Sequence, residues 1–301
     1  MQDTWHPCRL CGGNDFSVHF PARPSPASTS FRCTERWYQG HGQIVCCRRC
    51  GLLCANPRPD GATLAAVYAT VEDPLYLEEE EGRRATFRHV LSQLAGDGPP
   101  GALLDVGCYV GTFLQCAAEA GWRPVGIEPS AWASEIARHG RGLEIVQGTA
   151  EEGLRAFPAE AFDVVTLFDV IEHFDNPVAT LRAVHRVLRP GGRVYVSTID
   201  ISAPFGRLTG RWFPFLMTMH THYFTRSTLL SCLEAAGLEA IAVHPYPKVL
   251  SVGYLVDRVA GPWGKAGRVA SRLLRTVGLS KGMIPVPAWI GEILVAGQRG
   301  R

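Results

Sequence analysis

From residue 102 onward, short runs of apolar residues alternate with segments whose apolar residues recur at helical spacing. The runs lack a polar residue at every second position, which is typical of strands buried on both faces of a parallel sheet. Seven strands are expected, at residues 103–106, 125–128, 143–146, 162–168, 194–196, 238–243 and 290–296. Residues 162–168 are almost wholly apolar, so this strand is expected at the centre. The alternation predicts an α/β fold, a Rossmann-like, doubly wound and mostly parallel seven-stranded sheet.

The intervening helices carry recognisable start and stop signals. Asn176 and Pro177 are typical of a helix start, with the proline at the first helical position. The following apolar positions fall on one face of that helix: Val178, Leu181, Val184, Val187 and Leu188. Residues 190–192, Pro-Gly-Gly, are expected to end it.

Composition narrows the class of protein. The 301 residues are 46% hydrophobic, enough for one large domain and a small one, and the net charge of +2 does not indicate a nucleic-acid partner. No apolar run is long enough to cross a bilayer, and the first residues lack the pattern of a signal peptide. Ten cysteines in that context indicate metal ligands or free thiols in a reducing compartment. A cytoplasmic protein is expected.

Two copies of a Cys-x-x-Cys-Gly pattern lie in the first sixty residues, at 8–12 and 47–51. Two thiolates at this spacing can bind one ion, and the following glycine permits the turn that directs backbone N–H groups at sulfur. We expect a four-cysteine zinc site with the ligands Cys8, Cys11, Cys47 and Cys50. The alternative, small buried residues that happen to be cysteines, does not explain the repeat.

The loop between residues 105 and 111 indicates a nucleotide-type ligand. It joins a buried strand to a helix N-terminus, and Glu128 ends the next strand about twenty residues later, where a carboxylate can bind a ribose diol. A dinucleotide fold shares these features. However, the glycines run Asp-x-Gly-x-x-x-Gly, and Asp105 would repel a pyrophosphate but accept hydrogen bonds from an ammonium group. A sulfonium nucleoside with an amino-acid tail fits this pattern better than NAD.

Four motifs in order resemble those of class I S-adenosylmethionine-dependent methyltransferases. They are residues 103–111, 126–130, 162–173 with 176–177, and 188–192. The cysteine-bearing front resembles that of sugar C-methyltransferases and related bacterial enzymes with an N-terminal zinc motif. The resemblance covers roughly residues 100–245 and the last strand.

The resemblance implies a set of cofactor-binding residues. They are Asp105, Gly107, Cys108, Gly111, Glu128, Ala150, Glu151, Phe168 and Asp169. Two positions depart from the family pattern. Tyr109 replaces a loop glycine, so its ring must turn away from the cofactor or shape the pocket. Thr149 stands where many members have an adenine-binding aspartate, so Ala150 and Glu151 are expected to supply part of that contact.

Three histidines are candidates for a general base. His173 follows the fourth strand, and His220 and His222 precede the helix that usually borders the substrate pocket in this family. The alternative is that these histidines cap helices or bond to the backbone. Asp169 and Glu172 have two interpretations of the same kind: they are acids at the start of a helix, or they belong to the active site.

The predicted function is methyl transfer from S-adenosylmethionine to a small molecule, such as a sugar nucleotide, a cell-envelope precursor or a natural-product precursor. One alternative is an RNA methyltransferase with a zinc knuckle. It is disfavoured because the chain lacks a strongly basic, aromatic-interleaved face. A second alternative is a non-catalytic binding module, which the presence of both Asp105 and Glu128 argues against.

Four regions follow from these patterns. We expect a zinc-binding module at 1–60, a helical linker at 61–99, a methyltransferase domain at 100–245 plus 289–298, and a helical insertion or lid at 246–288. The linker carries an apolar stripe for packing beside the sheet: Phe87, Val90, Leu91 and Leu94. Its acidic run, 78–81, is interpreted as a solvated face.

The insertion combines two apolar stripes with the cations Lys265, Arg268, Arg272 and Arg275. The insertion is either a solvent-exposed helical segment or a lid that contacts an anionic acceptor. Peripheral contact with a membrane is a further expectation. Nothing in the sequence indicates an oligomeric state.

Overall fold

The apolar run Phe162–Phe168 forms strand β7, which lies fourth of the seven strands in the main sheet. The computed structural model describes residues 3–23, 31–32, 34, 40–94, 99–246, 248–253, 276 and 282–301. The sheet order is β10-β13-β8-β7-β4-β5-β6. The other strands are β4 (Ala102–Val106), β5 (Arg123–Glu128), β6 (Glu144–Gln147), β8 (Leu188–Ile199), β10 (Leu238–Pro245) and β13 (Glu292–Arg299). Strands β4 to β8 are parallel, and β13 is antiparallel to both neighbours, so the predicted fold class is confirmed.

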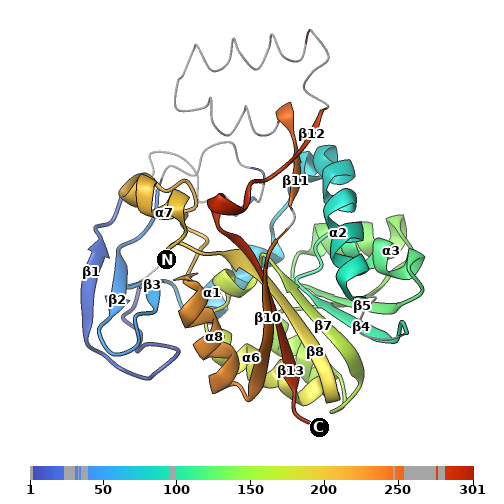
Figure 1. Ribbon diagram of the computed structural model, residues 1–301, viewed down its shortest axis with the longest axis horizontal. Helices are drawn as coiled ribbons and strands as arrows, with labels where there is room; N and C mark the ends of the chain where they lie inside the picture. Colours follow the sequence, from blue (N-terminus) through green and yellow to red (C-terminus); the bar gives the residue numbers. More distant parts are fainter. Residues whose placement is uncertain are drawn as a thin grey trace.

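Helices cover both faces of this sheet (Figure 1). One face carries α5 (Ala150–Ala156), α6 (Pro177–Val187) and α8 (Arg226–Ala235), and the other carries α2 (Glu80–Leu94) and α3 (Thr112–Glu119). Helix α6 begins as predicted, because the Asn176 side chain accepts a hydrogen bond from Ala179 N and Pro177 follows. Its predicted apolar face is buried. The end differs, since residues 188–192 already belong to β8.

Helix α2 packs as its apolar stripe predicted. Val90, Leu91 and Leu94 are buried, and the ring centroids of Phe87 and Phe113 lie 5.3 Å apart. The solvated-face interpretation of the acidic run is wrong for two of its residues. Arg141 Nη2 donates to Glu80 Oε2 at 3.0 Å, and Ser251 Oγ donates to Glu79 Oε1 at 2.8 Å, so this run anchors neighbouring segments.

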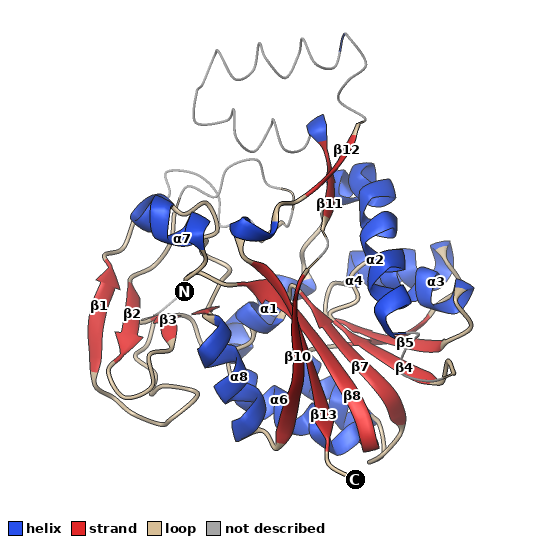
Figure 2. Cartoon of the chain, in the orientation of Figure 1, coloured by secondary structure: helices blue, strands red, loops and turns tan. Residues whose placement is uncertain are grey.

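A second, four-stranded sheet lies to the left of the main sheet in Figure 2. Three of its strands belong to the cysteine-bearing N-terminal region, and the described part of residues 1–60 is called the front module. The sheet consists of β1 (Phe16–Phe20), β2 (Ile44–Cys47), β3 (Leu53–Ala55) and β9 (His222–Tyr223), all antiparallel. Because β9 comes from a distant part of the chain, the front module and the main domain share this sheet. An ion pair joins them further: Arg58, only 2% exposed, donates to Asp175 Oδ1 at 3.0 Å.

The ends of the 246–288 segment form strands. β11 (Val249–Ser251) pairs with β12 (Met283–Pro285). Strand β11 rests on α2, where Val249 N donates to Thr86 Oγ1 at 2.8 Å. A Cβ atom at Gly82 would come within 2.8 Å of Val249 O, so only glycine permits this approach. The predicted basic residues and most of the apolar stripes of the insertion lie outside the described residues.

The remaining elements are short connections. They are α1 (Gly61–Ala69), η1 (Pro74–Glu79), α4 (Ala131–Glu135), η3 (Ile136–Gly140), η4 (Ile171–His173), α7 (Pro204–Thr209), η5 (Gly210–Trp212) and η8 (Ala288–Ile290). Among the described residues, no helix is both long and apolar enough to cross a membrane.

The Arg58–Asp175 pair yields a stability prediction. Asp175→Ala leaves a buried guanidinium without its carboxylate, and the free energy of unfolding should fall by roughly 2 to 3 kcal/mol. Urea denaturation measures this change. Asp15→Ala is the matched control, because the Arg48–Asp15 pair is exposed and should contribute less than about 0.5 kcal/mol. Equal effects of the two substitutions would contradict the account of the junction.

Candidate active site

Three acids mark the carboxyl ends of neighbouring parallel strands. Asp105 lies on β4, Glu128 ends β5, and Asp169 follows β7. In open α/β sheets the ligand crevice lies at this edge. Asp105 is buried on the central strand, and its Oδ1 accepts a hydrogen bond from Thr166 Oγ1 at 2.7 Å. Burial raises the pKa of Asp105 to about 7. No cation lies beside it among the described contacts, which suits a site for an ammonium group.

Glu128 is bound to the glycine loop. Its Oε2 accepts a hydrogen bond from Tyr109 N at 2.9 Å, and its Oε1 accepts one from Ser130 N at 2.7 Å. Each carboxylate oxygen keeps a second lone pair, which suits the two hydroxyls of a ribose. Burial raises the pKa of Glu128 to about 7. The backbone therefore orients this acid before any ligand binds.

The glycines in the loop leave no room for side chains. Gly107 has φ +78°, and a Cβ there would lie 2.6 Å from Val170 Cγ1. Gly111 has φ +79° and caps α3, and a Cβ there would lie 2.4 Å from Leu143 Cδ1. Cys108 lies between them, buried, with its backbone N–H bonded to Ile127 O at 3.1 Å. Both positions therefore require glycine, and the loop can pass close to the neighbouring segments that carry Val170 and Leu143.

Tyr109 adopts a left-handed backbone conformation, with φ +49°. Its ring centroid lies 4.4 Å from that of Tyr76 and 6.0 Å from that of Trp132. Arg83 Cζ lies 3.5 Å from the Tyr76 ring centroid. The ring therefore belongs to an aromatic wall built from three separate segments. Sequence reasoning missed Tyr76, Trp132 and Arg83, because no local spacing links them.

The other residues around the predicted adenine contact differ in their exposure to solvent and in their partners. Thr149 caps α5, with its side chain accepting from Glu152 N, so the departure from the family pattern has a local structural role. Ala150 is half-buried and Glu151 is exposed, and their adenine contact stays a prediction. Phe168 is half-buried, and its ring centroid lies 4.8 Å from that of Phe113.

Two of the three predicted histidines lie together. The ring centroids of His173 and His220 are 4.8 Å apart, and one ligand atom each from Glu172, His173 and His220 lies within 4.8 Å of the others. Burial lowers the pKa of both histidines, so both are neutral at neutral pH. Burial and the charge of Asp169 raise the pKa of Glu172 to about 8.

His222 lies elsewhere, on β9 beside β3. Its Nδ1 bonds to Thr221 Oγ1 at 2.9 Å, and its electrostatic neighbours are Arg58 and Arg9 of the front module. The structure therefore does not bring His222 to the other two histidines.

A half-buried lysine from the 246–288 segment reaches the same edge of the sheet. Lys248 Nζ lies 2.9 Å from Asp169 Oδ2 and 2.9 Å from Glu292 Oε1. Burial alone would lower the pKa of Lys248, but these two carboxylates raise it well above its usual value. Ser197 Oγ also donates to Asp169 Oδ1 at 3.0 Å. Lys248 and Glu292 were not among the sequence predictions, since only the fold brings them together.

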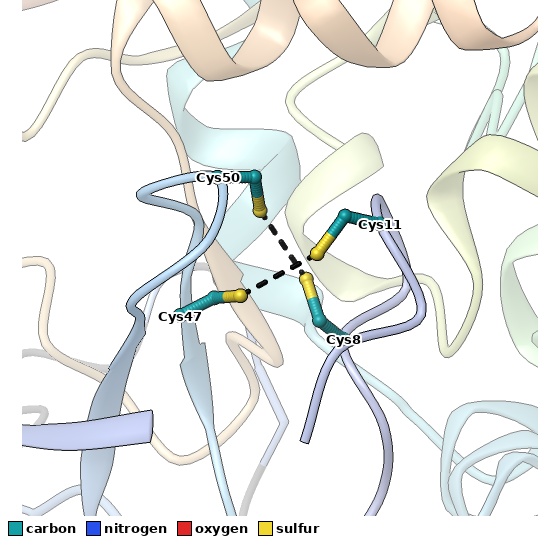
Figure 3. A group of neighbouring side chains, drawn as sticks. All are labelled: Cys8, Cys11, Cys47 and Cys50. Carbon is teal, nitrogen blue, oxygen red and sulfur yellow. Dashed lines mark hydrogen bonds between the residues drawn. The ribbon is translucent and has the colours of Figure 1, made fainter. Parts of the chain in front are cut away.

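The four predicted zinc ligands converge in the front module (Figure 3). The sulfur atoms of Cys8 and Cys50 lie 3.5 Å apart, as do those of Cys11 and Cys47. A disulfide has a sulfur–sulfur distance of about 2 Å, whereas ligands of a tetrahedral zinc with Zn–S bonds near 2.3 Å are separated by about 3.8 Å. Thus the four sulfurs fit a metal site.

The two turns around these cysteines have the geometry that the repeated pattern predicts. Gly12 and Gly51 have φ +72° and +77°, and their N–H groups bond to the carbonyls of Cys8 and Cys47 at 2.8 Å. Backbone N–H groups within each Cys-x-x-Cys turn also hydrogen-bond to the first sulfur of that turn.

The relatives described here are methyltransferases. A family model described as "Methyltransferase domain" matches residues 78–243, more than half of the chain. The ubiquinone biosynthesis O-methyltransferase of Aeromonas salmonicida (strain A449) is 32% identical over 178 residues, covering 52% of this chain and 74% of that relative. The enzyme of the same name from Pseudomonas aeruginosa (strain UCBPP-PA14) is 32% identical over 149 residues, covering 46% of this chain and 64% of that relative.

Solved structures agree on the fold. An S-adenosylmethionine-dependent methyltransferase from Archaeoglobus fulgidus superposes with a TM-score of 0.50 at 16% identity, covering 75% of this chain and all of that one. At that identity the likeness concerns the fold alone. Together with the family match and the arrangement of the strand-end acids, these findings show that the chain belongs to the class I S-adenosylmethionine-dependent methyltransferases.

Proposed function

We propose that this enzyme transfers a methyl group to a hydroxyl oxygen of a small molecule. The observation that carries the proposal is the set of buried and half-buried polar groups at the carboxyl edge of β7. It comprises Asp169, Glu172, His173, His220, Lys248 and Glu292. Several polar groups that converge at one point, half of them buried, suit a compact polar acceptor better than an extended polyanion. Two relatives carry names that specify O-methylation of a small molecule, which supports oxygen as the nucleophile.

We propose the acceptor classes expected from the sequence: a sugar nucleotide, a cell-envelope precursor or a natural-product precursor. The net charge of +2 supports a small molecule over RNA. Reduced cysteines at the metal site suit a reducing compartment, so we propose a cytoplasmic enzyme.

The glycine loop and the strand-end acids fit S-adenosylmethionine. Glu128 would hold the ribose diol, Asp105 would accept from the amino-acid ammonium, and the bare backbone at Gly107 and Gly111 would lie against the ligand. The bound cofactor supplies a methyl group activated by positive sulfur. The protein contributes chiefly by fixing the line of attack, and such positioning can lower a barrier by roughly 7 to 11 kcal/mol.

The active site must also remove the proton of the acceptor hydroxyl. The acceptor oxygen forms a bond to the methyl carbon as the carbon–sulfur bond breaks, and the electron pair of that bond stays on sulfur. The hydroxyl proton must leave as the new bond forms. We assign this assistance to the Glu172 cluster, defined as Glu172, His173 and His220, because its histidines are neutral and lie at the crevice edge. His222, on β9, is not included.

We propose a structural zinc ion for the front module, held by Cys8, Cys11, Cys47 and Cys50. The sulfur spacing and the N–H groups directed at sulfur support this assignment. Since β9 completes the same sheet, the ion would stabilise the segment that carries His220 as well as the module itself.

A label-transfer assay tests the proposed acceptor class. The enzyme is incubated with methyl-labelled S-adenosylmethionine and either a bacterial metabolite ultrafiltrate or total RNA. We expect label in the metabolite fraction, lost in Glu128→Gln. Label in RNA would support the RNA alternative, and cofactor binding without transfer to either fraction would support a non-catalytic module.

Substitution of Glu128 tests the ribose contact. Charge-assisted hydrogen bonds contribute on the order of 1.5 to 3 kcal/mol each, so Glu128→Gln should weaken S-adenosylmethionine binding at least tenfold by calorimetry. Glu144→Gln, at an exposed acid on β6, is the control and should bind normally.

The same contact predicts a pH dependence. Burial raises the pKa of Glu128 to about 7 in the free protein, and a diol favours the carboxylate, so affinity should rise as pH increases through about 7. The probe is 5′-methylthioadenosine, which has the diol but no amino group that titrates. Glu128→Gln should flatten this profile, and an unchanged profile in that variant would refute the assignment.

Elemental analysis tests the zinc proposal. Purified protein should contain about one zinc per chain, and Cys47→Ser should lose it with a large drop in the thermal stability of the front module. Cys54→Ser is the control, because Cys54 lies on β3 outside the four-sulfur group. Metal-free wild-type protein with an ordered front module would overturn the proposal.

A further inference from the structure

Tyr68, near the end of α1, contacts the Glu172 cluster. Its hydroxyl oxygen lies 2.8 Å from His173 Nδ1, and its hydroxyl donates to Met219 O at 3.3 Å. His173 Nδ1 also lies 3.1 Å from Met219 O. The three polar atoms thus contact one another, although they come from α1, η4 and the segment before β9.

These contacts determine which nitrogen of His173 carries the proton. A carbonyl only accepts hydrogen bonds, so the ring proton near Met219 O belongs to Nδ1, and the Tyr68 oxygen accepts from the same N–H. A proton on Nε2 instead would leave the lone pair of Nδ1 facing the lone pairs of the carbonyl oxygen. In the neutral ring, Nε2 therefore keeps the lone pair that can take a proton from the acceptor.

The ring of Tyr68 is held by the front module. Its centroid lies 5.2 Å from that of Phe31 at an interplanar angle of 88°, and 5.8 Å from that of His173 at 76°. Aromatic rings favour such edge-to-face contacts. Phe31 is 4% exposed and belongs to an apolar cluster with Leu64, Val71, Met217 and Met219. Phe31 therefore limits how far the phenol ring can move away from His173.

The chain that follows Tyr68 is held by two side chains. Val71 O accepts a hydrogen bond from Ser130 Oγ at 2.7 Å, which joins this chain to the end of β5. Thr34 N donates to Oδ2 of the fully buried Asp73 at 2.8 Å, which joins the same chain to the front module. The position of Tyr68 thus depends on both the main domain and the front module.

We propose that Tyr68 is a positioning residue for methyl transfer, which holds His173 with the lone pair of Nε2 available to the acceptor hydroxyl. The proposal rests on the proposed function, in which the Glu172 cluster takes the acceptor proton. That proton bonds to Nε2 as the acceptor oxygen bonds to the methyl carbon, and the imidazole becomes a cation. The N–H at Nδ1 then donates more strongly to Tyr68 and Met219 O, because charge assistance strengthens a hydrogen bond. Through Phe31, the front module takes part in this arrangement.

The Tyr68 hydroxyl also affects the proton affinity of His173. Burial lowers the pKa of His173, whereas the carbonyl of Met219 and the charge of Asp169 raise it. The titratable and charged groups around the ring are Tyr68, Asp169, Glu172 and His220, with Lys248 near His220. An oxygen that accepts a hydrogen bond from Nδ1 favours the protonated ring, so loss of the Tyr68 hydroxyl should lower the pKa of His173 further.

Histidine NMR on the intact chain tests the positioning without any acceptor. Protein labelled with ¹⁵N in histidine shows which nitrogen of each ring carries the proton and at what pH the ring titrates, and His173→Gln identifies the His173 signals. We expect Nδ1 to be protonated in the wild type. In Tyr68→Phe, which keeps the ring against Phe31, the form protonated at Nε2 should increase and the titration midpoint should move to lower pH.

Methyl transfer to the bacterial metabolite ultrafiltrate tests the catalytic consequence, at amounts where the rate rises linearly with ultrafiltrate. Tyr68→Phe should transfer label about tenfold more slowly, because a misplaced base loses part of its contribution. The acidic limb of its pH profile should move to lower pH, which a loss of packing alone would not cause. S-adenosylmethionine binding, measured on every variant, should be unchanged and separates this effect from a lost fold.

Tyr223→Phe is the matched control. It also removes a buried tyrosine hydroxyl bonded to a backbone carbonyl, since the Tyr223 hydroxyl donates to Met217 O at 3.1 Å. None of the contacts described for that hydroxyl involves His173. Tyr223→Phe should therefore leave the transfer rate, its pH profile and the His173 signals as in the wild type.

A double substitution tests whether Tyr68 acts through His173. In a His173→Gln chain, Tyr68→Phe should slow transfer no further, because the ring that it positions is absent. Phe31→Ala in the wild-type chain should slow transfer several-fold, whereas Trp5→Ala, at a front-module ring that is 61% exposed, should not.

Two results would overturn the proposal alone. They are His173 signals that do not change in Tyr68→Phe, and a Tyr68→Phe variant that transfers label as fast as the wild type while His173→Gln does not. A His173→Gln variant as active as the wild type would instead show that His173 does not take the acceptor proton, and this part of the proposed function would fail.

Discussion

Burial of carboxylates at the ends of parallel strands is the constraint on which this structure depends. Asp105 and Glu128 are almost completely buried, and their hydrogen bonds come from Thr166 and two backbone N–H groups. Because both folded-state pKa values are raised to about 7, these acids cost stability as pH rises above about 4. A ligand that donates hydrogen bonds to the carboxylates would recover part of that cost. In the free protein the ionised acids therefore carry a desolvation cost, which a ligand that donates hydrogen bonds would reduce.

The rest of the fold supports this edge. Lys248 fixes the start of the 246–288 segment against Asp169 and Glu292, while β11 rests on α2 at Gly82. On the opposite side, Arg58 joins the front module to Asp175, and β9 joins its sheet to the segment that carries His220. The front module and the described ends of the 246–288 segment thus border the site on two sides. A substitution in either region should therefore affect acceptor binding more than cofactor binding.

Local patterns predicted the parts of this protein that depend on neighbouring residues. The central strand 162–168, the start of α6 at Asn176 and the convergence of the four front cysteines followed from hydrophobicity, capping chemistry and spacing. Contacts between distant residues could not be predicted in this way. Tyr76 against Tyr109 and Lys248 between two acids depend on how separate segments meet, and so does the separation of His222 from His220. The acidic run at 78–81 was misread for the same reason, because Arg141 and Ser251 come from elsewhere in the chain.

The central claim is that the strand-end acids and the Glu172 cluster form one crevice, with the cofactor's sulfur directed at the cluster. A crystal structure with S-adenosylhomocysteine tests it most directly. The account predicts both ribose hydroxyls within hydrogen-bond distance of Glu128, the ammonium beside Asp105, directly or through water, and sulfur on the side of Glu172 and His220. A nucleoside bound away from Glu128, or sulfur facing away from that cluster, would contradict the account.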